Sequence, residues 1–532
     1  MMNRILLFLT GILFLGCLST PKKESPPNIV WLVAEDQSPE FFPMYAEVPV
    51  ALPYLSALAK DGVVFENAYS PVPVCAPARS ALITGMYPTS LGTHNMRTYN
   101  GYRTENQPTI NIPSYSPLLP EGVKMFTEYL RAANYYCTNN AKEDYNFKKT
   151  DGAWDESGTK AHWKKRTPDQ PFFAVINFGI SHESQIWNQQ DKPLAVAPEE
   201  VPLPPVFPDT PVVRKDIAVN YSNLVRLDKQ IGEIIEALKE EGLYENTLIF
   251  FYGDHGGPFP RYKRALYETG IKVPLVIKFP HQEKAGTRDN QFISFIDFAP
   301  TVLSLAGIQP PDYMQGKARF GSFKTEPSSY VFATSDRFDE QTDRVRAVRY
   351  KQYKYIRNFT VNLPHALPVK YREQMPMMKE LNALWETDSL DEKPALWFQT
   401  PKAVEEVYNI DLDPYELNNL AFDPEMKEVL EHLRQKLDEW IIETGDLGEI
   451  PEQTLLENWF PNGAVPVLSE LQKVDAATEY ALSHSNKGAS IVWKKATDSL
   501  WHPCTQPLPM NKNLVAKAVR IGYKDSPLLV LD

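Results

Sequence analysis

Four short, almost uninterrupted runs of apolar residues constrain the fold of this chain more than any other feature. They are residues 28–34 (NIVWLVA), 171–179 (PFFAVINFG), 247–253 (TLIFFYG) and 274–279 (PLVIKF). Runs of this length without polar alternation are typical of strands that are buried on both faces of a sheet. Such strands need helices on both sides, and helical patterns lie between them in the sequence. We therefore predict an α/β fold in which helices flank a large, mainly parallel sheet.

The helical patterns are amphipathic and have clear ends. Apolar residues spaced three and four positions apart predict a helix over residues 216–241, and a shorter helix over 297–306 is closed by Gly307. After about residue 320, runs with alternating charge within 329–358 predict a smaller antiparallel sheet, followed by a helix over 425–443. The expected regions are a catalytic domain (28–320), a C-terminal α+β subdomain (321–450) and a small β segment (465–532).

The N-terminus has the pattern of an export signal. The apolar run over residues 5–15 is too short to span a bilayer, and Cys17 follows a small residue where the run ends. This arrangement is typical of a bacterial lipoprotein, in which Cys17 would carry lipid that anchors the protein to a membrane. We predict an export signal over 1–17, a tether over 18–27, and a location in the periplasm, outer membrane or cell surface. An ordinary secretory signal with an incidental cysteine is the alternative.

Charge and cysteine content exclude several classes of protein. The formal net charge is −12, which disfavours general binding to nucleic acid, although a local cationic pocket can still bind an anionic small substrate. Apart from Cys17, the cysteines are Cys75, Cys137 and Cys504, and their wide spacing gives neither a disulfide framework nor a zinc pattern. Cys75 lies among prolines, where regular strand pairing is not expected, and therefore needs its own explanation.

Acidic and histidine side chains follow three of the predicted strands. The first run ends at Glu35 and Asp36, the second leads to His182, and the third leads to Asp254 and His255. Because the carboxyl ends of parallel strands share one edge of a sheet, these side chains are expected to converge. Oxygen and nitrogen ligands from two such strand ends would form a site for a divalent cation. The alternative is that the acids cap a loop and a turn.

The segment from Cys75 to Pro88 (CAPARSALITGMYP) resembles the signature of the type I sulfatases, which reads Cys-x-Pro-x-Arg followed by a Thr-Gly step. The resemblance extends over residues 27–450 and is strongest to the sulfamidase-like branch (N-sulfoglucosamine sulfohydrolases). It implies an alkaline-phosphatase-like fold. It also implies that Cys75 is oxidised to formylglycine, an aldehyde that hydrates to a diol. The partner would be a formylglycine-generating or anaerobic sulfatase-maturating enzyme that reads the unfolded chain.

The resemblance also implies roles for individual residues. The cation would be Ca²⁺ first, with Mn²⁺ or Mg²⁺ as alternatives because an imidazole is a poor ligand for calcium. Arg79 would stabilise the ionised diol, and His182 would protonate the leaving group. Lys142 and Lys263 would interact with the sulfuryl oxygens. The metal ligands would be Glu35, Asp36, Asp254 and His255, together with the modified Cys75.

The chain departs from the family pattern near Lys142. Most sulfatases carry Lys-x-His there, whereas this chain has Asp144 in place of the histidine. His94 is a candidate to occupy the pocket instead, or else a histidine of an exposed loop. Arg337 and Asp339, from the smaller region, are candidate sugar contacts, and the alternative is a solvated charged hairpin.

These inferences lead to one principal function and two alternatives. We expect a sulfatase that hydrolyses sulfate esters or sulfamates of glycans, with heparan- or heparin-type sugars favoured. One alternative is a phosphate- or phosphonate-ester hydrolase of the same superfamily, although the cysteine signature argues against a pure phosphatase. The other is a surface lipoprotein that binds sulfated glycans without turnover.

Overall fold

The computed structural model of the chain describes residues 26–98, 112–476, 479–510 and 513–531. The predicted export signal with Cys17 and most of the predicted tether lie outside these residues. Within the described ranges, no helix has both the length and the apolar character that crossing a membrane requires.

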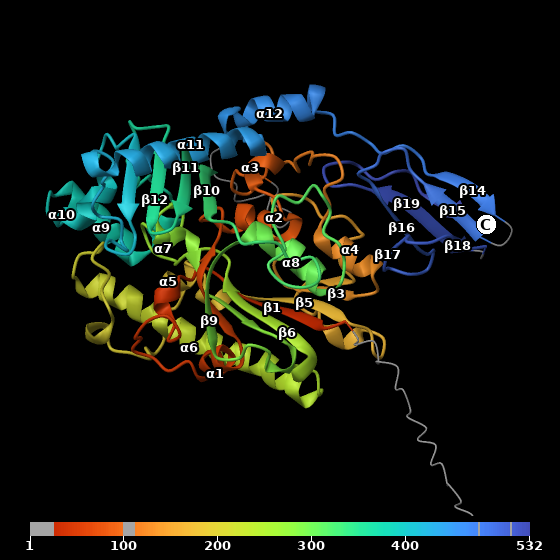
Figure 1. Cartoon of the computed structure of the whole chain (residues 1–532), viewed down its shortest axis with the longest axis horizontal. Coiled ribbons are helices and arrows are strands. Elements are labelled where there is room, and N and C mark those ends of the chain that lie inside the picture. The colour runs from red at the N-terminus through yellow and green to blue at the C-terminus, as the bar shows by residue number, and fades with distance from the viewer. Residues whose placement is uncertain (1–25, 99–111, 477–478, 511–512, 532) are drawn as a thin grey trace, which may run out of the picture.

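A nine-stranded sheet forms the centre of the molecule (Figure 1). The strands follow the order β4-β3-β5-β1-β6-β8-β2-β7, and β9 pairs with β2. Strand β1 is central, with β5 and β6 parallel to it on either side, so the predicted α/β class is confirmed. The bounds are β1 (Asn28–Ala34), β2 (Val63–Tyr69), β3 (Tyr136–Asn140), β4 (Glu156–Ser157), β5 (Phe172–Phe178), β6 (Thr247–Gly253), β7 (Lys272–Val273), β8 (Leu275–Lys278) and β9 (Thr287–Ser294).

The four predicted strands are all present, and one of them has an unexpected direction. β1 and β6 have the predicted bounds, and β5 is shorter by one residue at each end. β8 runs antiparallel to both β6 and β2. No long helix separates β8 from β6, and a parallel pair requires a crossover of that kind. The sheet is therefore parallel on the β1 side and mixed on the β8 side.

Helices cover both faces of this sheet, as predicted (Figure 1). Successive side chains of β1 alternate between the faces: Leu32 packs into the core beneath α1 and α6, and Trp31 packs into the core beneath α2, α4 and α8. These helices span Pro53–Asp61 (α1), Cys75–Thr84 (α2), Phe126–Ala132 (α4), Pro211–Glu240 (α6) and Phe298–Leu305 (α8).

Helix α6 begins five residues before the predicted start. The Val213 backbone N–H donates to Thr210 Oγ1 at 3.2 Å, so Thr210 is the N-cap. Pro211 occupies the first helical position, where its missing N–H has no cost. The buried face of the helix includes the predicted Leu224, Leu227 and Ile231.

The smaller antiparallel sheet is also confirmed. It comprises β10 (Tyr330–Phe338), β11 (Gln341–Tyr350), β12 (Tyr353–Asn358) and β13 (Glu405–Asn409). Helix α11 (Lys427–Thr444) packs on it through Leu433, Leu437 and Trp440. The remaining helices are α3 (Pro88–Leu91), α5 (Ser184–Asn188), α7 (Glu268–Ile271), α9 (Pro376–Glu386), α10 (Glu392–Ala395) and α12 (Glu452–Trp459).

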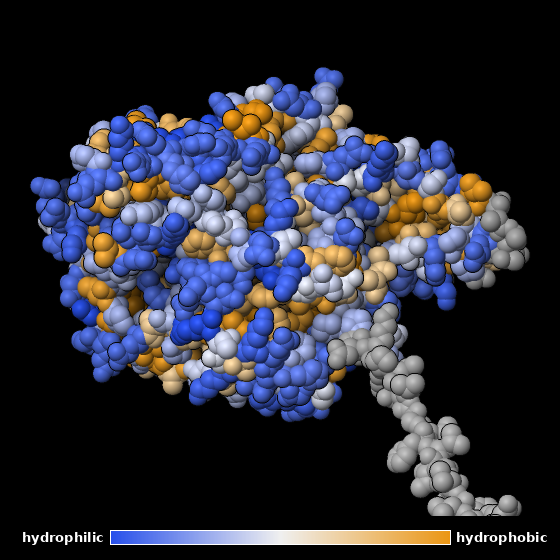
Figure 2. Space-filling view, viewed as in Figure 1, coloured by the Kyte–Doolittle hydropathy of each residue, from blue (hydrophilic) through white to orange (hydrophobic). Residues whose placement is uncertain are grey.

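The C-terminal residues form a separate β unit with its own small core (Figure 1). Two antiparallel sheets build it. One contains β14 (Gln472–Ala476), β15 (Glu479–Ser483) and β18 (Leu508–Pro509), and the other contains β16 (Ser490–Lys495), β17 (His502–Pro503), β19 (Leu514–Val519) and β20 (Leu529–Leu531). Figure 2 shows a mostly hydrophilic face for the main body and clusters of hydrophobic side chains on this unit.

Candidate active site

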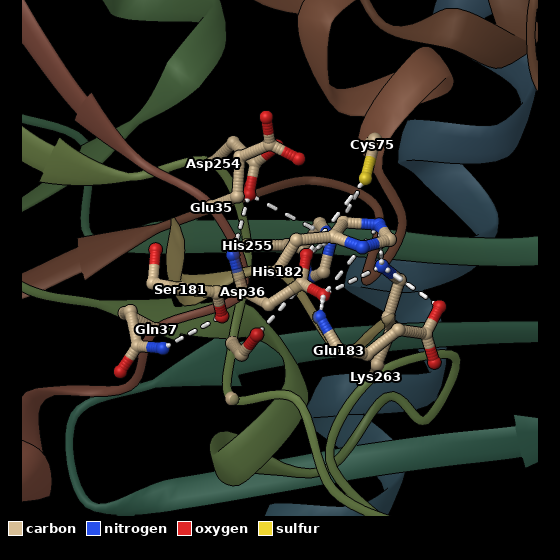
Figure 3. Close-up of polar contacts among 12 residues, drawn as sticks. Glu35, Asp36, Gln37, Cys75, Ser181, His182, Glu183, Asp254, His255 and Lys263 are labelled. Carbon is tan, nitrogen blue, oxygen red and sulfur yellow. Dashed lines mark hydrogen bonds and ion pairs between the residues drawn. The ribbon is translucent and has the colours of Figure 1, made fainter. Parts of the chain in front are cut away.

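Carboxylates and an imidazole meet where β1 and β6 end (Figure 3). The two strands are parallel neighbours, with Ala34 opposite Gly253, so the residues that follow them emerge at one edge of the sheet. Asp36 Oδ1 lies 3.0 Å from His255 Nε2, and the Asp36 backbone N–H donates to Asp254 Oδ1 at 2.9 Å. All three side chains are fully buried. Burial opposes protonation of His255, but the negative charges around it raise its pKa to about 10.

Cys75 is the first residue of α2 and points into this cluster (Figure 3). Its exposed fraction is 0%, and its Sγ lies 3.3 Å from His255 Nε2 and 3.9 Å from Asp36 Oδ1. Burial raises the pKa of a thiol, but here the positive charges of Lys142 and Lys263 lower the Cys75 pKa to about 6. The surroundings of residue 75 are therefore positively charged and closed to solvent.

Arg79 follows Cys75 by one helical turn and lies on the same face of α2. Its Nε and Nη2 donate to Asp254 Oδ2 at 3.2 and 2.9 Å, and its Nη1 donates to Asn177 Oδ1 at 2.6 Å. Asn177 comes from β5 and also donates to the Lys142 carbonyl at 3.3 Å. Asn177 could not be predicted from the sequence, because an amide inside an apolar strand gives no motif of its own.

Lys142 lies near Arg79, because Asn177 contacts both residues. Its Nζ contacts Glu35 Oε2 at 2.7 Å and Asp144 Oδ2 at 3.8 Å. Burial opposes ionisation of Asp144, but Lys142 and Arg97 lower its pKa below the usual value. The position where the family usually carries a histidine therefore holds an anionic carboxylate within the charged site.

Lys263 and His182 form the third side of the site (Figure 3). Lys263 Nζ lies 2.7 Å from Asp36 Oδ2, 3.0 Å from Glu183 Oε1 and 3.3 Å from His182 Nε2. The Ser184 backbone N–H donates to His182 Nδ1 at 3.2 Å. His182 therefore presents its Nε2 to the site, beside the ammonium group of Lys263.

A second layer of charge supports this side, and it includes three residues that were not predicted from the sequence: Glu183, Arg264 and Arg97. Arg264 Nη1 and Nη2 donate to the two oxygens of Glu183, each at 2.9 Å, and Arg264 Nε donates to Asp339 Oδ2 at 2.6 Å. Asp339 therefore lies in the same charge network as Lys263. The neighbouring charges of Asp144 and Asp339 raise the pKa of the Arg97 guanidinium despite its burial.

The other two predicted substrate contacts, Arg337 and His94, are both buried and contact groups of the protein. Arg337 forms an ion pair with Glu452 at 2.5 Å and donates to the Met96 carbonyl at 3.1 Å. His94 is 2% exposed, so it is not a histidine of an exposed loop, and burial lowers its pKa. The charges that act on His94 include those of Asp336 and Arg346. Neither Arg337 nor His94 belongs to the groups of possible metal ligands among the described residues.

The possible metal ligands form two overlapping groups within the described residues. In each group, the ligand atoms lie within 4.8 Å of one another. Asp36, Cys75, Asp254 and His255 make the first group, and Glu35, Asp36, Cys75 and His182 make the second. The predicted ligands are thus divided, with Glu35 in the second group and Asp254 and His255 in the first. The shared residues, Asp36 and Cys75, mark the centre of the site.

Comparison with known proteins agrees with this geometry. The sulfatase family profile matches residues 27–308, and the profile of the C-terminal region of N-sulphoglucosamine sulphohydrolase matches residues 253–392. An ulvan-active sulfatase of Formosa agariphila is 39% identical, over 98% of this chain and 97% of its own length. Human N-sulphoglucosamine sulphohydrolase is 25% identical, over 84% and 96% respectively.

Solved structures show the same fold. One protein, solved in complex with its substrate D-glucosamine-2-N,6-O-disulfate, superimposes with a TM-score of 0.56 at 15% identity, over 80% of this chain and 99% of that one. The match of profile, relatives and fold covers the segments that position the cluster around Cys75. The chain therefore belongs to the sulfatase family of sulfuric ester hydrolases.

Proposed function

We propose that this sulfatase removes sulfate groups from glycans by means of a formylglycine formed from Cys75 and a divalent cation bound beside it. The observation that carries the proposal is the position of Cys75 Sγ, 3.3 Å from His255 Nε2 and 3.9 Å from Asp36 Oδ1. A buried thiol that serves only packing does not require two lysines around it, as Cys75 has in Lys142 and Lys263.

The residues present fit a divalent cation. The carboxylate oxygens of Asp36 and Asp254 are hard ligands of the kind that Ca²⁺ and Mg²⁺ prefer, and the imidazole of His255 also suits Mn²⁺. The pKa of Asp36 is well below the usual value despite burial, because Lys263 and His182 lie beside it, so this carboxylate is ionised and able to bind a cation. We assign Ca²⁺ as the first candidate, held by Asp36, Asp254, His255 and residue 75, with Glu35 on the second side.

The rest of the site can then be given roles. When present, the cation and formylglycine supply positive charge and a hydrated aldehyde as the nucleophile at position 75. Lys142 and Lys263 place ammonium groups where sulfuryl oxygens would gain negative charge as the bond to sulfur breaks. His182 donates a proton from Nε2 to the leaving oxygen or nitrogen. Arg79 fixes the carboxylate of Asp254 through two hydrogen bonds.

For the substrate, we propose a sulfated polysaccharide, with ulvan tested first. The relative that matches at 39% over the whole chain is active on ulvan, whereas the N-sulphoglucosamine sulphohydrolase matches at 25%. Heparin-type sugars, favoured by the sequence analysis, remain the second candidate. A lipid anchor on Cys17, together with export to the periplasm or cell surface, would place the enzyme where such polymers are available.

The test combines a mass measurement with an activity assay. The chain is produced together with a maturation enzyme, and mass spectrometry of the peptide that contains residue 75 reports whether formylglycine is present. Sulfate release is then followed on ulvan oligosaccharides, N-sulfated and O-sulfated glucosamine, and a phosphate monoester. We expect release from at least one sulfated sugar and none from the Cys75→Ala variant.

Other outcomes would separate the alternatives. Turnover by Cys75→Ala would overturn the role of residue 75. Faster hydrolysis of the phosphate monoester than of any sulfated sugar would favour a phosphate-ester hydrolase. An unmodified thiol in every molecule from the native source, with binding of glycans but no turnover, would favour the non-catalytic glycan-binding lipoprotein.

A further inference from the structure

A second hollow lies outside the active site, at the junction between the main body and the C-terminal β unit. It has a volume of about 840 Å³. Its walls come from four parts of the chain: residues 113–116, residues 148–151, helix α12 with the linker that follows it, and residues 520–525. We refer to it as the junction groove. Its size is within the range of ordinary ligand sites.

The walls of the junction groove are held in fixed positions. Gly522 has a φ of 83°, and a Cβ at this position would lie 2.4 Å from the Pro117 carbonyl oxygen, so the β unit touches the main body closely there. Arg131 Nη2 donates to the Trp501 carbonyl at 2.7 Å, and Arg520 Nη2 donates to the Leu119 carbonyl at 3.2 Å. These bonds connect the unit to the body on two sides, so the groove is formed before any ligand binds.

The lining contains charges of both signs. Lys149 pairs with Glu143, while Asp151 and Asp525 share Lys517, and Glu457 adds a third carboxylate. Lys148 and Lys524 are exposed and, within the described residues, have no carboxylate within ion-pair distance. These two lysines are the groups of the groove that favour an anionic ligand.

Aromatic and aliphatic side chains lie between these cations. Tyr115, Phe460, Tyr523 and Leu456 contribute to the lining. Tyr523 is half-buried, and the guanidinium of Arg520 lies 4.6 Å from the centre of its ring. The C–H faces of sugar rings pack on aromatic rings, and sulfate or carboxylate groups bind to lysine and arginine. A lining with both features suits an acidic carbohydrate better than a simple anion.

The junction groove is close to the active site along the chain. Lys142 contacts Glu35 in the active site, and Lys148 lines the groove. The six residue-to-residue steps from Lys142 to Lys148 span at most about 22 Å even when fully extended. An oligosaccharide of several rings with one end in the active site is therefore long enough to reach the groove.

We propose that the junction groove is a second binding site for the sulfated glycan, which holds a part of the polymer that is not being cleaved. The inference rests on the proposed function for the class of ligand, and it assigns to the C-terminal β unit a role in selecting long chains over short ones. Lys148 and Lys524 bind the anionic groups, and Tyr523 packs against a sugar ring.

The experiment compares two charge-matched variants of the full chain. Lys148→Glu/Lys524→Glu reverses two charges in the groove, and Lys60→Glu/Lys229→Glu reverses two exposed charges on α1 and α6, on the other face of the central sheet. Affinity for ulvan and for heparin is measured by titration calorimetry in the Cys75→Ala background, so that no turnover occurs. Kinetics on a polymer and on a sulfated monosaccharide are measured in the matured enzyme.

We expect the groove variant to bind the polymer about tenfold more weakly than the control, which corresponds to about 1.4 kcal/mol. The KM for the polymer rises, while kcat and the activity on the monosaccharide stay unchanged. Tyr523→Ala should weaken polymer binding in the same direction without a change of charge.

The outcomes also distinguish this inference from the proposed function. Equal affinity of the groove and control variants for both polymers would overturn the junction groove and leave the catalytic proposal standing. Groove-dependent binding of a polymer, with no sulfate released from any sugar by the matured wild-type enzyme, would support the groove and overturn the catalytic proposal.

Discussion

Two buried clusters of charge in this molecule have a similar composition, but they differ in whether their polar atoms are available to bind a ligand. One lies at the ends of β1 and β6 around Asp36 and Cys75. The other lies in the smaller sheet, where Arg346 of β11 pairs with Asp336 at 2.9 Å and with Asp446 at 2.5 Å. Arg346 is fully buried, and its Nη1 also donates to the carbonyls of Ser335 and Val345, both at 2.9 Å.

The difference lies in the direction of the ligand atoms. Every nitrogen of Arg346 has an acceptor within the protein, so no donor is left for a ligand. Around Cys75, by contrast, oxygen, nitrogen and sulfur atoms from three elements point at a common centre. Burial of charge alone therefore does not identify a functional site, whereas convergence of metal-ligating atoms does.

Removal of the metal should distinguish the roles of the two clusters most clearly. A chelator should reduce sulfate release by at least a thousandfold, because the cation contributes several kcal/mol of transition-state stabilisation. It should also lower the Tm, by an amount that adding back the preferred ion reverses. Add-back of Ca²⁺, Mn²⁺ and Mg²⁺ in separate assays identifies the ion. Full activity after exhaustive chelation, verified by metal analysis, would contradict the proposed site.

The Arg346 cluster should respond only in stability. Arg346→Met leaves Asp336 and Asp446 buried without their cation, which we expect to cost about 3–5 kcal/mol of unfolding free energy. The turnover number of the folded fraction should not change. Calorimetry with and without chelator provides the measurement, since the loss should be the same in both. Partial recovery in the triple variant that adds Asp336→Asn and Asp446→Asn is the control.

Substitution of Lys263 tests the contribution of one charged group within the active-site cluster. Lys263→Met keeps much of the side-chain volume but removes the ammonium group between Asp36 and Glu183. We expect kcat/KM to fall by about 10²–10³, or roughly 3–4 kcal/mol, as for the loss of one electrostatic donor. Steady-state kinetics on the best substrate measure the effect. An unchanged kcat/KM would mean that Lys263 supports the fold and not the reaction.

A buried carboxylate that forms no ion pair among the described residues gives the smallest effect. Asp216 in α6 is 0% exposed and accepts hydrogen bonds from the Met377 N–H and from Gln190, both at 2.7 Å, and burial raises its pKa to about 7. Because the folded pKa is above the unfolded value of 3.8, ionisation of Asp216 reduces stability as the pH rises from about 4 to 7.

The matching variant is Asp216→Asn. It should increase the unfolding free energy by about 1–2 kcal/mol at pH 8, since the loss of charge-assisted hydrogen bonds offsets part of the gain. Near pH 4 it should have no stabilising effect. Thermal unfolding at both pH values measures this, and a stabilisation that is equal at both would contradict the assigned pKa.

The sequence was sufficient to predict what depends on local pattern. The bounds of β1 and β6 follow from uninterrupted apolar runs, and the acids after them follow from the rule that parallel strands end at one edge of the sheet. The Cys75 motif is local as well. These features need no knowledge of which distant segments meet.

What could not be predicted depends on contacts between distant segments. Arg337 is a predicted sugar contact because it lies in a charged stretch, but that stretch does not indicate its ion pair with Glu452, 115 residues away. Arg264 and Glu183 are 81 residues apart, and nothing in either local sequence indicates their pairing. The direction of β8 likewise depends on which neighbours it finds.

The positions of the strands along the chain also determine the order in which the parts of the site are synthesised. Strand β6, which completes the edge that holds the site, begins at Thr247, about 170 residues after Cys75. At a synthesis rate of about 5–20 residues per second, β6 appears roughly 10–30 s later than Cys75. Pairing between strands so far apart in sequence is itself slow. If Cys75 is modified as proposed, the topology would leave an interval of time in which a maturation enzyme can reach residue 75 before the sheet closes.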